Sequence, residues 1–236
     1  MICPYCNDDS VCPFYRLRYN PNNFYPPLTV TTSRITNSNE KINESLQIPV
    51  FSGNINKNIL SNINSNIKND IMEFRNQMES AAEENAANLK KQGKKPNPYQ
   101  IATTYSITYN KNNILSVSLF YQEYIGGKNS YIRTAYNYDL NNGDSMSLGN
   151  LFKPSTNYLA VLNQKTRRFL QLNYPGMLPQ FNGISEDQPY YIDNNTLVIF
   201  PRFNQIAPSI SEIPLVRIPL GELSDILKPQ LLRFYP

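Results

Sequence analysis

Isoleucine recurs at every fourth position of one polar segment of the chain, from Ile55 to Ile71. Phe74 and Met78 continue this stripe, which follows the 3.6-residue period of an amphipathic helix. A Ser-Gly-Asn sequence before the stripe offers a helix cap, and a glycine followed by two prolines ends the pattern. The spacing therefore predicts a helix over about 54–92, with the isoleucine stripe packed in a core.

Downstream of this helix the period changes from about four residues to two. Apolar and aromatic residues alternate with small polar ones between about residues 100 and 141, and turns rich in Asn and Gly divide the segment. This pattern predicts an antiparallel meander, with one face packed on the helix and a second face of Ser, Thr and Asn. The alternating tyrosines can stack on sugars, but their period favours packing against the helix. They are Tyr105, Tyr109, Tyr121, Tyr136 and Tyr138.

Shorter patterns lie on both sides of the helix and the meander. The order of strands and helices predicts an α+β fold, with antiparallel sheets each packed by a helix. The additional elements are strands at 28–36 and 46–51, a helix at about 156–174, and strands at about 189–203 and 212–219. We divide the chain into two intimately associated α+β domains, 28–145 and 146–236, preceded by an extended arm over residues 1–27.

The arm is rich in proline, which favours an extended path, and it carries all three cysteines of the chain, Cys3, Cys6 and Cys12. An odd number of cysteines cannot pair fully within one chain, so we regard these three as candidates for intermolecular disulfides. Zinc binding would need a fourth ligand, from Asp8, Asp9 or a second chain. The Cys3-Pro4-Tyr5-Cys6 sequence resembles a redox motif, but it lacks the preceding strand that such motifs use.

The chain contains no histidine. This absence removes the commonest general base and the catalytic triads that depend on it. No glycine-rich phosphate loop or nucleophile elbow occurs either. Two acidic pairs, Glu83-Glu84 and Glu186-Asp187, could serve a hydrolase only if they converged with other acids. We therefore expect a protein that is not an enzyme, with no catalytic residues, no cofactor and no metal site.

The net charge of +4 is only mildly basic. The one dense group of cations, Lys90, Lys91, Lys94 and Lys95, falls at the predicted C-terminal end of the helix, where cations stabilise the helix dipole. We therefore expect no nucleic-acid partner. No run of about 20 apolar residues occurs, so no membrane span is expected, and the N-terminal segment lacks the pattern of a signal peptide.

Several short motifs resemble a known pair of domains. They are Ile48-Pro49-Val50-Phe51-Ser52-Gly53 before the helix, Ser147-Leu148-Gly149-Asn150-Leu151-Phe152, Leu197-Val198-Ile199-Phe200, Ile206-Ala207-Pro208, and the run from Ile213 to Pro219. Over roughly 28–228 they are similar to tandem domains of unknown function. These domains occur in the extracytoplasmic region of anti-sigma-V factor, a lysozyme sensor, and in the non-catalytic N-terminal region of some peptidoglycan deacetylases. The family usually has an acid before Ile-Ala-Pro, where this chain has Gln205.

Two functional hypotheses follow. The first is a non-enzymatic, self-assembling protein of a spore or cell surface layer or appendage, whose subunits are linked as a homo-oligomer or polymer through the arm. It would reach that surface without a classical signal peptide; the alternative location is the cytoplasm. The second, implied by the resemblance, is a binding module for cell-wall glycan or a wall-degrading enzyme. Lysozyme is strongly basic and matches a chain of net charge +4 poorly.

Overall fold

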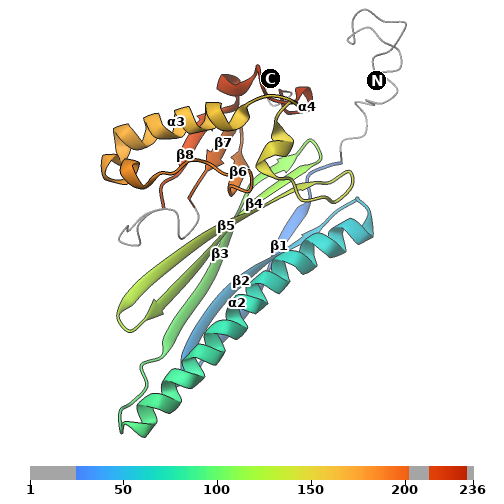
Figure 1. The fold of residues 1–236 in the computed structure, drawn as a ribbon. Coiled ribbons are helices and arrows are strands. Elements are labelled where there is room, and N and C mark those ends of the chain that lie inside the picture. Colours follow the sequence, from blue (N-terminus) through green and yellow to red (C-terminus); the bar gives the residue numbers. More distant parts are fainter. Residues whose placement is uncertain (1–24, 202–212, 233–236) are drawn as a thin grey trace, which may run out of the picture.

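The computed structural model describes residues 25–201 and 213–232, and this part has an α+β fold of two sheets and two main helices (Figure 1). The larger sheet has the strand order β1-β2-β3-β4-β5, from Thr29–Ser38, Ile42–Ser52, Tyr99–Lys111, Ile114–Ile125 and Lys128–Asp139. The smaller sheet has the order β6-β7-β8, from Tyr190–Asp193, Thr196–Ile199 and Val216–Pro219. The main helices are α2 (Lys57–Lys91) and α3 (Tyr158–Asn173). Shorter helical turns are Leu148–Leu151, Pro175–Gln180, Leu220–Leu223 and α4 (Pro229–Leu232).

The larger sheet is mixed, which corrects the expectation of wholly antiparallel sheets. β2 pairs with β3 in parallel from Ile42↔Tyr99 to Leu46↔Thr103, whereas the other strand pairs are antiparallel. The cause is α2, whose 35 residues rise about 52 Å at ~1.5 Å per residue. The helix carries the chain back to the end of the sheet where β2 began (Figure 1). A strand that starts again from that end runs parallel to its neighbour.

The isoleucine stripe of α2 packs on one face of the larger sheet, as the sequence pattern predicts. Ile63, Ile67 and Ile71 are each 0% exposed and belong to a core shared with β2, β3 and β4. The helix begins just after Asn56, whose side-chain oxygen accepts a hydrogen bond from the backbone N–H of Asn58 at 2.8 Å. This cap satisfies one of the donors that a helix N-terminus leaves unpaired.

A bulge in β3 changes the face to which its last residues point. The register of β3 on β4 shifts between Ile107 and Tyr109, so two residues of β3 oppose a single residue of β4 there. Ile107 packs against the core below α2, whereas Tyr109 is buried in the core of the smaller sheet. The regular alternation in the sequence placed Tyr109 on the helix face, and this assignment was wrong because a bulge interrupts the two-residue period.

The smaller sheet lies between α3 and the larger sheet. One of its faces, which includes Ile192, Leu197 and Ile218, packs under α3 in a separate core. The opposite face presents Tyr191 and Val198 to Ala135 of β5. The hairpin between β6 and β7 turns at Asp193-Asn194-Asn195, where Asn194 has a φ of 50°. Asparagine tolerates this left-handed conformation better than most residues.

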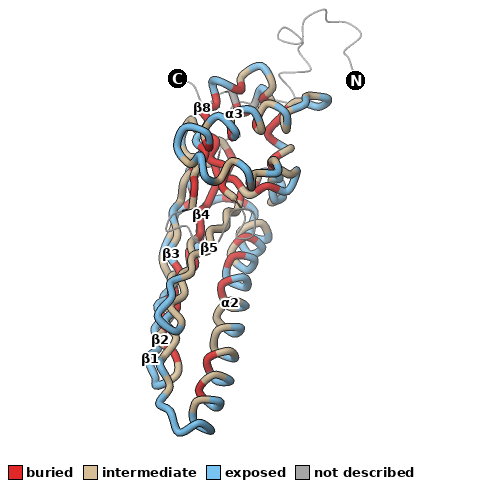
Figure 2. The backbone as a smooth tube through the Cα atoms, turned by 60° about the vertical axis from the view of Figure 1, so that its left-hand side comes forward, coloured by how far each residue is buried: buried red, intermediate tan, exposed pale blue. Residues whose placement is uncertain are grey.

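Buried hydrogen bonds fasten the smaller sheet to the outer face of the larger one, the face opposite α2. Ser116 Oγ donates to Asn137 Oδ1 at 2.6 Å and accepts from the backbone N–H of Ile192 at 3.0 Å. Asn137 Nδ2 donates to the carbonyl of Tyr190 at 2.8 Å. The smaller sheet therefore covers only one end of the outer face, the end where β4 is most buried (Figure 2).

The start of the described chain is fixed near the same end. The backbone N–H of Tyr25 donates to Asn113 Oδ1 at 2.8 Å, and Asn110 exchanges hydrogen bonds with the backbone of Leu28 at 2.9 and 2.8 Å. The arm predicted over 1–27 lies almost entirely outside the described residues, as do Cys3, Cys6 and Cys12. Within the described part of the chain, no helix is both long and apolar enough to cross a membrane.

A buried ion pair joins β2 to α2. Glu44 is 3% exposed, and its carboxylate accepts from Arg75 Nε at 3.1 and 3.2 Å and from Nη2 at 3.1 Å. Arg75 Nη2 also donates to Glu79 at 2.8 Å. The hydrogen bond to Glu44 raises the pKa of Arg75, against the opposing effect of burial. This pair satisfies a charge that would otherwise lie unpaired inside the sheet.

We expect Arg75→Met to lower the free energy of unfolding by roughly 3 kcal/mol, because it leaves the Glu44 carboxylate buried without its partner. The double variant Glu44→Leu, Arg75→Met removes both charges and should recover most of that loss. Urea unfolding of the wild type and the two variants measures both effects. A double variant no more stable than Arg75→Met would contradict this account.

Candidate binding face

The uncovered end of the outer face is a flat polar surface. Its side chains form rungs across the strands, set by the register. The first rung is Ser38, Asn43, Gln100, Tyr124 and Asn129, and the second is Thr36, Ser45, Ala102, Gln122 and Tyr131. The third consists of the paired Arg34 and Gln47 together with the paired Thr104, Phe120 and Arg133, just beyond the last β2–β3 pair at Leu46 and Thr103. We call these three rungs the outer binding face. None of these residues carries a carboxylate.

An open groove of about 410 Å³ runs over the first two rungs. Side-chain amides dominate its lining, which includes Asn43, Gln100, Gln122 and Asn129, with Tyr124 as its aromatic side chain. Each amide offers both a donor and an acceptor, and no residue in this lining other than Glu44 is acidic. Because Glu44 points to the helix side and is paired with Arg75, the groove itself is uncharged.

Aromatic rings and one cation form the part of the face nearest the smaller sheet. The rings of Phe120 and Tyr131 are stacked, with centroids 5.4 Å apart. The guanidinium carbon of Arg133 lies 5.3 Å from the centroid of Phe120 on its own rung. Phe120, Tyr124 and Tyr131 are all half-buried, so part of each ring meets solvent. Rings that are held in place and still accessible suit stacking on the apolar faces of a ligand.

The five tyrosines named from the sequence lie elsewhere, in the two cores. Tyr109, Tyr121 and Tyr138 are buried, and Tyr105 and Tyr136 pack against the core below α2. Burial raises the pKa of Tyr121 to about 12, and it raises the pKa of Tyr136 further, whose hydroxyl donates to Asp70 at 2.6 Å. The preference for packing against the helix over sugar stacking is therefore confirmed for four of these residues, whereas Tyr109 packs in the core of the smaller sheet.

The aromatic residues on the accessible face were missed because the other positions of the same strand face are mostly polar, so no aromatic period marks them. Phe120 and Tyr124 of β4 are separated by Gln122, and Tyr131 of β5 is followed two positions later by Arg133. The register of β4 on β5 brings them together, and register is a property of two strands rather than of one sequence. One sequence feature could have identified them. The even positions of β4 hold Phe120, Gln122 and Tyr124, and they face away from the apolar odd positions that pack in the core.

Two groups of sequence candidates are not brought together by the fold. Glu83 is on α2, where it pairs with Lys41 at 3.4 Å, and Glu186 lies in the loop before β6. The Ile206-Ala207-Pro208 motif lies outside the described residues, as does Gln205. Among the residues that the structure describes, no three acidic or cysteine side chains form a metal-binding group.

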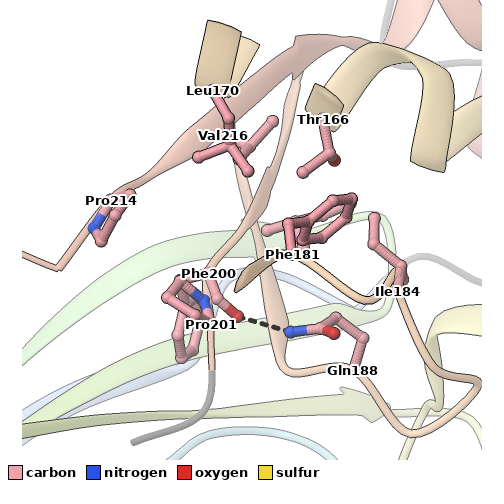
Figure 3. Close-up of a pocket in the computed structure, with 10 residues that line it drawn as sticks. Thr166, Leu170, Phe181, Ile184, Gln188, Phe200, Pro201, Pro214 and Val216 are labelled. Atoms are coloured by element: carbon pink, nitrogen blue, oxygen red, sulfur yellow. Dashed lines mark hydrogen bonds between the residues drawn. The ribbon is translucent and has the colours of Figure 1, made fainter. Parts of the chain in front are cut away.

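A second cavity lies under α3 in the smaller subdomain (Figure 3). It measures about 20 Å³, which is room for about one water molecule. Its walls are mainly apolar and include Leu170, Phe181 and Val216, and Gln188 closes it by donating to the carbonyl of Phe200 at 2.7 Å. Thr166 Oγ1 is buried there without a hydrogen-bond partner in the described chain. This cavity is too small to hold a ligand.

The comparisons with known proteins agree with this fold. Residues 35–130 match the family model described as Deacetylase PdaC. A DUF3298 family member from Bacteroides fragilis superposes with a TM-score of 0.69 at 14% identity, covering 88% of this chain and 97% of its own. A DUF3298 family protein from Pseudomonas aeruginosa gives a TM-score of 0.58 at 14% identity, covering 87% and 95%.

The class that the fold defines is therefore an α+β protein with the architecture of the DUF3298 structures. Within that class, its first part resembles the Deacetylase PdaC family from the end of β1 to the start of β5. No protein with a curated description matches the chain. These matches confirm the resemblance that the short sequence motifs indicated. What they show is the fold.

We expect Thr166→Val to raise the free energy of unfolding by about 1 kcal/mol, because it replaces an unpaired buried hydroxyl by a methyl group of similar size. Thr166→Ser is the matched control: it keeps the hydroxyl, enlarges the cavity and should lower stability by about 1 kcal/mol. Urea unfolding compares the three proteins. A loss of stability in Thr166→Val would show that the hydroxyl has a partner, such as a water molecule in the cavity.

Proposed function

We propose that this chain is a non-catalytic binding module for cell-wall glycan, and that the glycan lies along the outer binding face. The observation that carries the proposal is the open, amide-lined groove next to accessible rings on one uncovered face of the sheet. Sugars present hydroxyl and amide groups at their edges and apolar C–H faces. Side-chain amides form hydrogen bonds with the hydroxyl and amide groups, and aromatic rings pack on the C–H faces.

The dimensions of the face suit an extended ligand. Residues two apart on a strand are separated by about 6.8 Å, so the three rungs span about 14 Å from the row of Tyr124 to the row of Arg133. The groove of about 410 Å³ lies in the size range of small-molecule sites, although it is open along its length. An open, shallow groove accepts a segment of a polymer, whereas a closed pocket would admit only a free small molecule.

The charge of the outer binding face favours glycan over a wall-degrading enzyme as the partner. The outer binding face holds two cations, Arg34 and Arg133, and no carboxylate. A strongly basic enzyme such as lysozyme would meet like charge on this face. A neutral or mildly acidic polymer meets no such repulsion. The sequence motifs also resemble the non-catalytic N-terminal region of some peptidoglycan deacetylases, and residues 35–130 match a family model described as Deacetylase PdaC, which is consistent with a role at cell-wall sugars.

We expect the chain to sediment with insoluble peptidoglycan, and the double variant Gln122→Ala, Tyr124→Ala to bind about tenfold more weakly, because it removes one amide and one ring from the groove. The matched control is Tyr174→Ala, which removes a half-buried tyrosine after α3, away from the groove. Equal binding by the double variant and the wild type, or absence of wild-type binding, would contradict the proposal.

Self-assembly through the arm is a second proposal, which rests on the sequence. All three cysteines precede Tyr25, where the described body begins. The body holds the chain at that point through Asn110 and Asn113, at the far end of β3 from Gln100 in the groove. Links made through the arm would therefore leave the outer binding face uncovered. The two proposals are compatible: such a chain would be a surface-layer subunit that also binds the wall.

We expect air-oxidised protein to show dimers and higher species on a non-reducing gel, and these species should collapse to monomer when a reductant is added, because three thiols cannot pair fully within one chain. The variant with Cys3, Cys6 and Cys12 all replaced by Ser should stay monomeric under the same conditions. A single monomeric band from the oxidised wild type would remove the covalent form of assembly.

A further inference from the structure

Arg133 on β5 is a half-buried cation whose hydrogen-bonding capacity is mostly unused. Its Nη1 donates to Ser118 Oγ at 2.7 Å, and its guanidinium lies against the ring of Phe120. Its Nε is enclosed but has no hydrogen-bond partner. No ion pair joins Arg133 to a carboxylate within the described chain. Enclosed arginine nitrogens are usually paired, so within the described chain this half-buried guanidinium lacks an anionic partner.

The charged groups around Arg133 do not supply the missing negative charge, and one of them adds a further positive charge. The smaller sheet places Tyr191 and Arg217 on the face that it turns toward β5. Asp193 pairs with Arg217 Nη1 at 2.9 Å, so it is already engaged. Burial lowers the pKa of Arg133, Tyr191 opposes that effect, and the charge of Arg217 lowers the pKa further. Among the described residues, the junction of the two sheets therefore keeps one net positive charge without a counterion.

We propose that Arg133 forms a carboxylate-binding subsite at the end of the outer binding face. The guanidinium fork matches the geometry of a carboxylate, and the stack of Tyr131, Phe120 and Arg133 fixes its plane. This inference rests on the proposed glycan binding, and it names the ligand more closely. The ligand is an amino-sugar polymer that carries carboxylate groups, such as a lactyl ether or an attached acidic peptide.

The position of Arg133 determines how such a ligand would lie. It is on the third rung, about 14 Å from the row of Tyr124, so a sugar over the groove and an acidic group at Arg133 belong to the same short oligosaccharide. The three rings favour a ligand with pyranose faces over a phosphate polymer of open-chain polyols, which offers no such face to stack.

The test compares two soluble ligands of equal length by calorimetry with the full chain. One is an oligosaccharide that alternates N-acetylglucosamine with N-acetylmuramic acid, and the other is a neutral N-acetylglucosamine oligosaccharide. We expect the wild type to bind the acidic ligand about tenfold more tightly, the size of one charge-assisted pair, and this preference should shrink as salt is added.

Arg133→Met should abolish the preference, so that the acidic and neutral ligands bind with equal affinity, and Arg133→Lys should keep only part of it, because lysine lacks the planar fork. Arg34→Met, which removes the other arginine of the face, is the matched control and should keep the preference. Arg133→Met should also raise the melting temperature of the free protein, since it removes an unpaired, half-buried charge. A purely structural arginine would instead lower the melting temperature when replaced.

The possible outcomes separate the two proposals. If neither ligand binds the wild type, the proposed glycan function fails. If both ligands bind equally, or if Arg133→Met keeps the preference, glycan binding stands and the carboxylate subsite is overturned. If inorganic phosphate competes with the acidic ligand more strongly than acetate does, the subsite recognises phosphate rather than carboxylate, and the inference is again overturned.

Discussion

The structure depends on how the isoleucine stripe of α2 is buried. A 35-residue helix with a predominantly polar surface gains its stability from that stripe, and only one face of the larger sheet can cover it. This assignment commits the odd positions of β4, such as Val117 and Leu119, to the helix. The even positions then form the outer face, which is divided between the smaller sheet at one end and solvent at the other.

Much of this arrangement could be predicted from the sequence. The helices, the meander and the β6–β7 hairpin follow local periodicity and turn residues, and they lie within a few residues of the expected bounds. The parallel pairing of β2 and β3 was missed because it depends on where a long helix returns the chain. The position of Tyr109 was missed because a bulge changes the face of a strand without a clear signal in its sequence.

The candidate site was harder to predict, for a related reason. The strong alternation of apolar and polar positions marked the core tyrosines as candidates, because buried strand positions hold large side chains. The accessible rings of Phe120 and Tyr124 on β4 and of Tyr131 on β5 form one surface only through the register of the two strands. The ion pair of Glu44 and Arg75 could not be predicted for the same reason. The two residues are 31 positions apart, and no local sequence pattern links them.

The amide lining of the groove has a consequence for how recognition responds to acidity. Asn43, Gln100, Gln122 and Asn129 do not ionise, and the chain has no histidine that would change its charge in mildly acidic surroundings. If a glycan binds in this groove as proposed, the protein side of the contact keeps the same charge at neutral and mildly acidic pH. Weaker binding at mildly acidic pH would then indicate protonation of the glycan, not of the groove.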